Sequence, residues 1–155
     1  MSLQQDVDLL RNIPLFAKIE PSKLKLLAFT AERLTFSQGD VLCRQGDEGD
    51  SAYIIIDGEA DVLVNTDAVE VTVATLKTND FLGETAILCD VPRTATVQAK
   101  TDLEALMISK DLFFQLIYQF PSMSIEIMRE LASRVERTTA QLREAVSQRP
   151  VEPRN

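Results

Sequence analysis

The segment from Asn79 to Val97 reads NDFLGETAILCDVPRTATV and is the most informative stretch of the chain. A turn leads to Gly83 and Glu84, a short apolar stretch follows, and Pro92-Arg93 precedes a β-branched strand. A glycine before a short helix lets backbone amides approach an anion, and the first helical turn has unpaired N–H groups. Arg93 adds a planar fork of donors suited to a phosphate, while Glu84 is a pure acceptor suited to a sugar hydroxyl. The segment therefore predicts a cradle for a sugar phosphate.

Short β-rich segments surround this stretch, from Leu34 to Ser109. They are separated by polar or glycine-containing turns, and all five glycines of the protein lie between them. About eight short strands in about 75 residues predict an antiparallel sandwich or jelly roll. We expect the run Tyr53–Ile56 to be buried on both faces because it lacks alternation. The other expected strands are at 34–36, 41–42, 62–64, 69–73, 95–97 and 103–108.

Helical periodicity is found on both sides of the β-rich region. It predicts a short helix at about 4–11 and a second at about 21–30, with Pro21 near its start. Further along, one helix ends at Pro121 and a longer one runs from 122 to about 147. The longer helix has an apolar stripe that either covers the sheet or mediates self-association. This stripe consists of Met128, Leu131, Val135, Thr138, Leu142 and Ala145.

The composition excludes several kinds of catalytic and metal site. The chain has 155 residues, 45% hydrophobic and 26% charged, as in an ordinary globular domain. It has no histidine, which excludes Ser-His-Asp and Cys-His sites and zinc sites of mixed Cys/His type. Cys43 and Cys89 lie far apart without metal-ligand spacing, and we interpret them as small core residues. No nucleophile–base pair or metal site is apparent, so we do not expect an enzyme.

The charge and the hydropathy limit the partners of the chain. A net charge of −8 argues against a nucleic-acid-binding surface, so a bound phosphate needs a local, enclosed site. No run approaches the roughly 18 apolar residues of a membrane span. The first residues, MSLQQDVDLLRN, lack the basic start and apolar core of a secretory signal. We therefore expect a cytoplasmic protein.

Two long patterns together resemble the cyclic-nucleotide-binding domain family. This family includes catabolite activator protein, the regulatory subunits of cyclic-AMP-dependent protein kinase and cyclic-nucleotide-gated channels. The first pattern is Gly39-Asp40-Val41-Leu42, Gln45-Gly46-Asp47, Asp50 and Tyr53-Ile54-Ile55 through Gly58. The second, the phosphate-binding cassette, is Phe81-Leu82-Gly83-Glu84, Ala86, Leu88 and Pro92-Arg93-Thr94-Ala95. The resemblance covers roughly residues 10–147.

The resemblance implies a role for each residue of the candidate site. Arg93 would pair with the charged oxygen of the cyclic phosphate, and Glu84 would accept from the ribose 2′-hydroxyl. Backbone amides of Gly83 and the cassette helix would complete the cradle, and Val62 and Val73 would form the apolar face for the base. The full candidate set is Gly83, Glu84, Thr85, Ala86, Arg93, Thr94, Ala95, Val62, Val73, Arg134, Thr138 and Thr139.

The choice between cyclic AMP and cyclic GMP depends on Thr94 and the long helix. Thr94 follows the arginine where cyclic-GMP-dependent kinases also have threonine. Residues 132–139 are similar to the segment of catabolite activator protein whose adjacent hydroxyl residues touch the adenine, one of them across a dimer. The resemblance then implies that Thr138 and Thr139 read the base and that Arg134 reaches towards Glu84. We expect cyclic AMP to be preferred, and no further cofactor.

The sequence thus predicts an α+β fold: an antiparallel β-roll or jelly-roll barrel with short N-terminal helices and a C-terminal helical pair. We expect one cyclic-nucleotide-binding domain over 1–147, with N-terminal helices at 1–30, the roll at 31–109, the cassette at 81–97 and C-terminal helices at 110–147. A flexible tail would follow at 148–155.

The predicted function is a non-catalytic sensor that signals through its C-terminal helices to an effector and forms a homodimer through the helix at 122–147. Two alternatives are a dimerising structural module that no longer binds nucleotide, and the sensor part of a transcription factor that lacks its DNA-binding domain. This chain alone would not contact nucleic acid.

Overall fold

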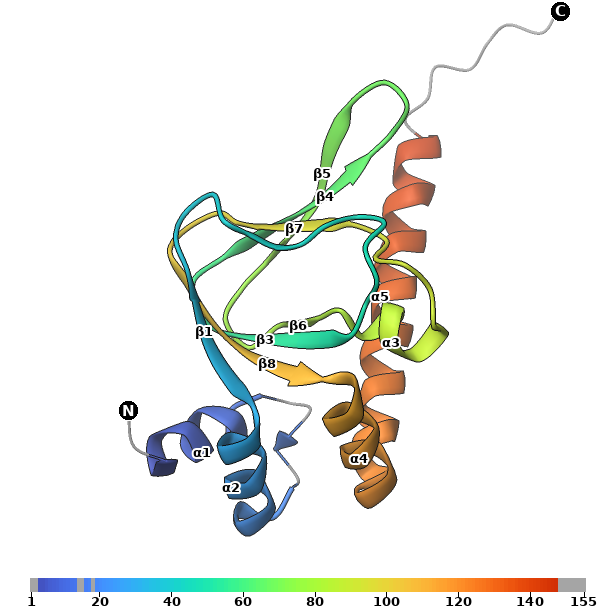
Figure 1. Ribbon diagram of the computed structural model, residues 1–155. Helices are drawn as coiled ribbons and strands as arrows, with labels where there is room; N and C mark the ends of the chain where they lie inside the picture. Colours follow the sequence, from blue (N-terminus) through green and yellow to red (C-terminus); the bar gives the residue numbers. More distant parts are fainter. Residues whose placement is uncertain (1–2, 14–15, 18, 148–155) are drawn as a thin grey trace, which may run out of the picture.

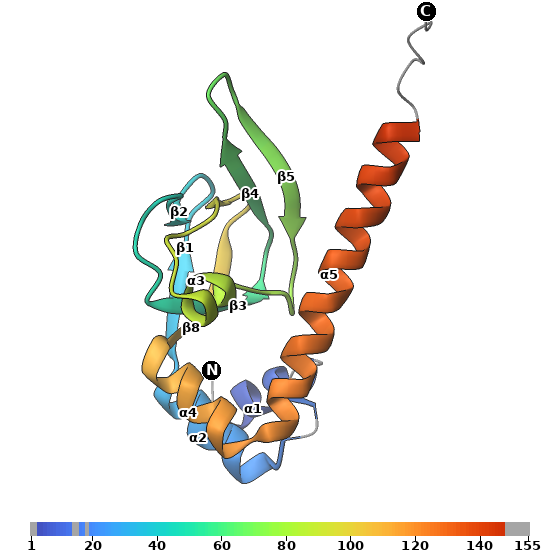
Figure 2. The ribbon, with the colours of Figure 1, turned by 90° about the vertical axis from the view of Figure 1, so that its right-hand side faces the viewer.

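The computed structural model describes residues 3–13, 16–17 and 19–147 and has the predicted α+β architecture (Figure 1). An antiparallel β-roll lies above two short N-terminal helices, and a long C-terminal helix runs along one side of it (Figures 1 and 2). The predicted tail at 148–155 lies outside the described residues. None of the described helices combines the length and the apolar character that crossing a membrane requires.

The β-roll consists of eight strands among the described residues: β1 (Glu32–Phe36), β2 (Val41–Cys43), β3 (Ser51–Asp57), β4 (Ala60–Asn65), β5 (Glu70–Leu76), β6 (Phe81–Leu82), β7 (Thr96–Ala99) and β8 (Leu103–Ser109). They form two four-stranded sheets, with the orders β1-β8-β3-β6 and β2-β7-β4-β5. All pairings are antiparallel. The sequence did not predict β6, which has two residues that pair with Tyr53 and Ile54.

Strand β3 is buried on both faces, as predicted. Alternate side chains of a strand point to opposite faces of its sheet. Tyr53 and Ile55 therefore pack inside the roll, whereas Ala52, Ile54 and Ile56 pack against the helical layer. This strand joins the two hydrophobic clusters and fixes the floor of the roll.

The helical layer is built from α1 (Leu3–Arg11), α2 (Pro21–Thr30), α4 (Lys110–Gln119) and the first turns of α5 (Pro121–Ser147). Pro21 lies in the first turn of α2, where its missing N–H costs nothing. Ser109 caps α4, since its hydroxyl accepts from the backbone N–H of Leu112. Arg33 on β1 forms ion pairs with Asp6 and Glu104, which ties α1 to the roll.

The two cysteines are unpaired, and only one of them differs from the sequence interpretation. Cys43 is half-buried, but Cys89 is exposed at the end of α3 (Glu84–Cys89), so its interpretation as a core residue was wrong. The helix α3 has only six residues, and its outer side faces solvent. No group of three or more Cys, Asp or Glu side chains in the described part of the chain is placed to hold a metal ion.

Candidate functional site

A cavity of about 530 Å³ lies between the β-roll, α3 and α5. It is open to solvent on one side, and the segments that enclose it are far apart in sequence. Every residue of the candidate set lines this cavity except Thr139. The lining also includes eleven residues outside the set: Cys43, Ala74, Thr75, Leu76, Asp80, Phe81, Leu82, Val97, Glu130, Arg137 and Gln141.

Gly83 begins α3 in a backbone conformation that other residues rarely adopt, with φ of 93°. A Cβ atom there would lie 2.5 Å from Nη1 of Arg93 and 2.8 Å from the backbone oxygen of Ser51. The glycine therefore serves two purposes, a left-handed turn and room for a guanidinium. Because α3 starts here, its unpaired N–H groups lie beside Arg93 at the wall of the cavity.

Arg93 is buried, and its side-chain hydrogen-bond partners among the described residues are uncharged. Nη2 donates to the backbone oxygen of Ser51 at 2.7 Å and to Ser51 Oγ at 3.3 Å, and Nη1 contacts the oxygen of Gly83 at 3.4 Å. No carboxylate in the described part of the chain lies within ion-pair distance of it. A buried charge is costly unless it is paired. The guanidinium is thus held in place and still lacks a counter-charge.

The turn between β2 and β3 hydrogen-bonds to the backbone of Arg93. The Arg93 N–H donates to Asp47 O at 2.8 Å, and the Gly46 N–H donates to Arg93 O at 2.9 Å. A Cβ on Gly49 would lie 2.2 Å from Cβ of Ala86, so the turn touches α3 directly. Sequence reasoning identified these glycines only as turn residues and did not identify Ser51 at all, since a serine at a strand start carries no specific signal.

Glu84 is the other charged residue enclosed in the wall, with 1% of its surface exposed. Its Oε1 accepts from Nη1 of Arg134, and the two groups form an ion pair between α3 and α5. Its Oε2 is buried without a hydrogen-bond partner in the described structure. Burial raises the pKa of Glu84, and the Arg134 guanidinium opposes this by lowering it. One carboxylate oxygen is therefore occupied, and the other is left to accept a hydrogen bond.

Arg134 ties α5 to the cassette at three points. Besides Glu84, it donates to the backbone oxygen of Phe81 at 2.7 Å, and its guanidinium carbon lies 4.9 Å from the centre of the Phe81 ring. The predicted reach of Arg134 towards Glu84 is thus present in the structure. Any change at Glu84 therefore acts directly on the middle of α5 through this ion pair.

The walls of the cavity differ in chemical character from one side to the other. Charged and polar groups gather at α3, whereas β4 and β5 contribute an apolar wall that includes Val62, Val73 and Leu76. Cys43 lines the β2 side, and burial raises the pKa of its thiol despite the nearby charge of Arg93. A ligand with an anionic end and a flat apolar end matches this arrangement.

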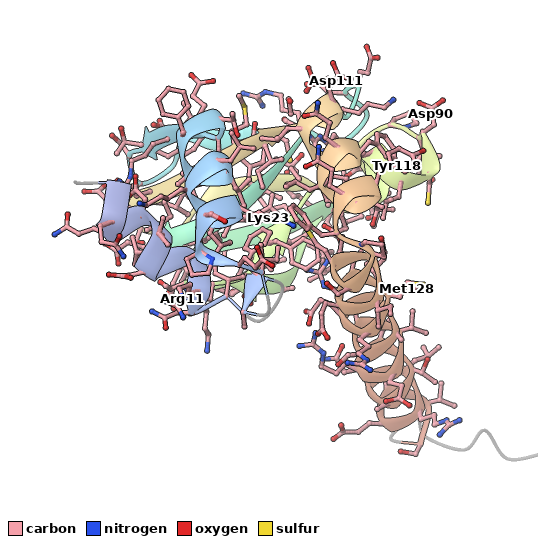
Figure 3. All side chains as sticks on the ribbon, turned by 90° about the horizontal axis from the view of Figure 1, so that it is seen from below. Arg11, Lys23, Asp90, Asp111, Tyr118 and Met128 are labelled. Carbon is pink, nitrogen blue, oxygen red and sulfur yellow. The ribbon has the colours of Figure 1, made fainter. Side chains whose placement is uncertain are left out.

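The helix α5 presents two adjoining faces, which the predicted stripe did not separate. Leu131 packs against the helical core and Thr138 lines the cavity, so these two members of the stripe face the roll. The outer face, which borders the inner one, carries Ile125, Met128, Val135, Leu142 and Val146, all exposed. Figure 3 shows Met128 on the outer side of the helix. Thr139, two positions from Gln141, lies about 160° round the helix from it and shares this outer face.

The residues of the inner face of α5 that sequence reasoning missed follow a simple spacing. Glu130, Arg137 and Gln141 lie four residues before and three and seven residues after Arg134. Side chains at these intervals share one helical face. Once Arg134 was placed towards Glu84, this periodicity could have predicted the other three.

The family model for the cyclic nucleotide-binding domain matches residues 33–120. A cAMP-dependent protein kinase regulatory subunit from Blastocladiella emersonii is 35% identical over 109 residues, which is 70% of this chain and 27% of that one. The chain spans about a quarter of the length of the first curated relatives that it matches.

Two solved structures are similar over most of the chain. The catabolite activator protein of Thermus thermophilus is 25% identical, with a TM-score of 0.77, and the match covers 86% of this chain and 63% of that one. The regulatory subunit of a cAMP-independent protein kinase A from Trypanosoma brucei is 26% identical, with a TM-score of 0.75, over 90% of this chain and 51% of that one.

Proposed function

Since this chain belongs to the cyclic nucleotide-binding domain family, and the curated relatives that it matches include kinase regulatory subunits, we propose that it is a sensor that binds cyclic AMP in the cavity beside α5. One observation carries this proposal. A buried Arg93 without a counter-charge and a buried Glu84 with an unpaired oxygen line the same cavity at the start of one helix. This pair is complementary to a phosphate next to a hydroxyl.

The cyclic phosphate would occupy the space in front of Arg93 and the first N–H groups of α3. The guanidinium then gains the anion it lacks, in a site where Ser51 already fixes its orientation. The ribose 2′-hydroxyl would donate to Oε2 of Glu84, which satisfies the orphaned acceptor. Each contact replaces an incomplete interaction of the free protein, and this favours the bound state.

The relatives differ in the cyclic AMP dependence that their names state, so we infer the preferred nucleotide from the site. The name of one describes a cAMP-dependent kinase, whereas that of another describes a cAMP-independent one. Thr138 lines the cavity, and its hydroxyl donates to the backbone oxygen of Arg134. Its two lone pairs can still accept from an exocyclic amine of a base, as contact with adenine requires. Thr94, at the α3 end, is consistent with either nucleotide.

Isothermal titration with cyclic AMP, cyclic GMP and 5′-AMP tests this proposal. We expect cyclic AMP to bind more tightly than cyclic GMP, and 5′-AMP to bind weakly because its phosphate is not ring-closed. Wild-type protein that binds neither cyclic nucleotide would overturn the proposal in favour of a structural module.

The output would pass through α5. Arg134 holds this helix to Glu84, so a ligand on Oε2 alters the strength and direction of that ion pair. The ligand shifts the helix between two arrangements by its difference in affinity for them. Hydrogen exchange over 121–147 should slow when cyclic AMP saturates the protein, with exchange in 103–109 of the core strand β8 as an internal reference. Unchanged exchange over 121–147 would refute this coupling.

We also propose that the outer face of α5 pairs with a second copy. Residues 125, 128, 132, 135, 139, 142 and 146 alternate in steps of three and four, the pattern of a two-stranded coiled coil. Leu142 lies in this row and is 63% exposed. Sedimentation velocity should show a dimer of the wild type and a monomer of Leu142→Lys. The exposed residue Arg143→Lys is the control, and a dimer that survives Leu142→Lys would contradict the proposal.

A further inference from the structure

The inner face of α5 carries an exposed polar side chain that makes no hydrogen bond to another described residue. Gln141 lines the cavity, and no other described residue hydrogen-bonds to its carboxamide. At about 100° per residue, it lies within about 20° of the line of Arg134. It is thus centred on the cavity-facing side of the helix, whereas Thr138 lies about 60° away from it.

The position of Gln141 along the helix matches the far end of a bound nucleoside. Arg134 marks the level of Glu84, where the ribose would lie, and Gln141 is about 10 Å further along the axis. Helical side chains lean back towards the N-terminus, which brings the carboxamide part of the way towards the ribose. The β4–β5 hairpin extends beside this half of α5 (Figure 2). The apolar wall for the base and Gln141 therefore face the same space.

Neighbouring polar groups of α5 are less available than Gln141. A nitrogen of Arg137 lies 3.7 Å from a carboxylate oxygen of Glu130, and Glu130 also lies 3.6 Å from Arg134. The charge of Arg137 is thus directed towards the end of the cavity where the sugar would lie. The hydroxyl proton of Thr138 is used within the helix. Gln141 alone among these offers one donor and one acceptor side by side.

We propose that Gln141 is a specificity-determining residue that reads the Hoogsteen edge of adenine, its Oε1 accepting from the N6 amine and its Nε2 donating to N7. The edge of adenine presents one donor and one acceptor, which a carboxamide matches in a bidentate manner. The same edge of guanine presents two acceptors, O6 and N7, which a carboxamide cannot match with both of its groups. This inference rests on the proposed function and adds to it the residue that selects the base.

The test compares Gln141→Leu with wild type for cyclic AMP, cyclic GMP and 7-deaza cyclic AMP, which lacks the N7 acceptor. Gln115→Leu is the matched control, because Gln115 is exposed on α4 and does not line the cavity. We expect Gln141→Leu to weaken cyclic AMP by about five- to tenfold and cyclic GMP by less than about twofold. Wild type should bind 7-deaza cyclic AMP less tightly than cyclic AMP, whereas Gln141→Leu should bind the two alike.

The possible outcomes distinguish the role of Gln141 from the proposed function. Equal cyclic AMP affinity in Gln141→Leu and wild type would overturn the role of Gln141 and leave the proposed function intact. An equal loss for all three nucleotides would also overturn it, because it would indicate only a structural role. Wild-type protein that binds none of the three would overturn both proposals. Circular dichroism of each variant verifies that α5 is retained.

Discussion

Replacing Arg93 with methionine is the sharpest test of the site, because its effects on stability and on binding differ in size. Methionine keeps much of the side-chain volume and removes the charge. In the free protein the substitution removes one strong hydrogen bond, to Ser51 at 2.7 Å, and two long contacts at 3.3 and 3.4 Å. A hydrogen bond from a charged donor contributes about 1.5–3 kcal/mol. The buried guanidinium has a desolvation cost of several kcal/mol, which the substitution removes.

These two contributions oppose one another, so we expect the free energy of unfolding to change by less than about 1 kcal/mol. Binding has no such compensation. The nucleotide phosphate would be left in the cavity without its counter-ion, which costs about 2–5 kcal/mol. This corresponds to a loss of about 30- to several-thousand-fold in affinity for cyclic AMP.

The assay combines urea unfolding without ligand, titration calorimetry and thermal unfolding with ligand. Cyclic AMP at about 100 times its Kd should raise the wild-type free energy of unfolding by about 2.7 kcal/mol, a shift of roughly 5–10 °C in Tm for a chain of this size. Arg93→Met should show at most about a third of this shift at the same concentration. Arg143→Met makes the same chemical change at an exposed position of α5 outside the cavity and should behave as wild type. An Arg93→Met affinity within about tenfold of wild type would refute the reasoning.

Three further predictions follow from the cavity walls. Burial raises the pKa of Glu84 above 4.5, so the folded state binds more protons than the unfolded state. The free energy of unfolding of the wild type should therefore fall relative to that of Glu84→Gln as pH rises above 4.5. Thermal unfolding of both proteins between about pH 4 and 8 checks this. Gly83→Ala should destabilise the fold by about 1–3 kcal/mol in urea and weaken cyclic AMP, because its Cβ would lie 2.5 Å from a guanidinium nitrogen. Gly39→Ala, at φ of 92° with nothing within 4 Å, isolates the backbone cost. In a Cys89→Ser protein, cyclic AMP should slow the alkylation of Cys43 measured by mass spectrometry, and equal rates with and without nucleotide would contradict its place in the site.

Local rules were sufficient to predict most of the fold. Period-two patterning, glycine turns and helix-starting prolines place the strands and helices within a few residues of where they lie. Strand β6 was missed because two residues carry no periodicity, and its pairing with Tyr53 and Ile54 is a long-range contact. The burial of β3 could be predicted because its unbroken run of Tyr and Ile has no polar face.

The candidate site was predicted by resemblance more than by local chemistry. Spacing alone placed Glu84 and Arg93 near each other but did not show that Ser51 orients one and Arg134 the other. These partners lie 42 and 50 residues away in the chain, and only the folded roll brings them together.

The rotation of α5 could not be decided from sequence, because two apolar rows share three members. Met128, Val135 and Leu142 belong to both rows, and the rows differ only in neighbours one position apart. Leu131 and Thr138 fit one row, and Ala132 and Thr139 fit the other. Hydrophobicity does not separate the two rows, whereas in the structure the roll and the helical core occupy the side of Leu131 and Thr138.

The attachment of α5 at Arg134 makes the helix a lever arm. The ion pair to Glu84 lies near its middle, and Ser147, 13 residues further along, is about 20 Å beyond this pivot. A tilt of about 10° at the pivot would sweep the end of the helix through about 3 Å. A displacement at the ion pair too small to alter the proposed nucleotide contacts would thus be magnified into a larger movement at Ser147.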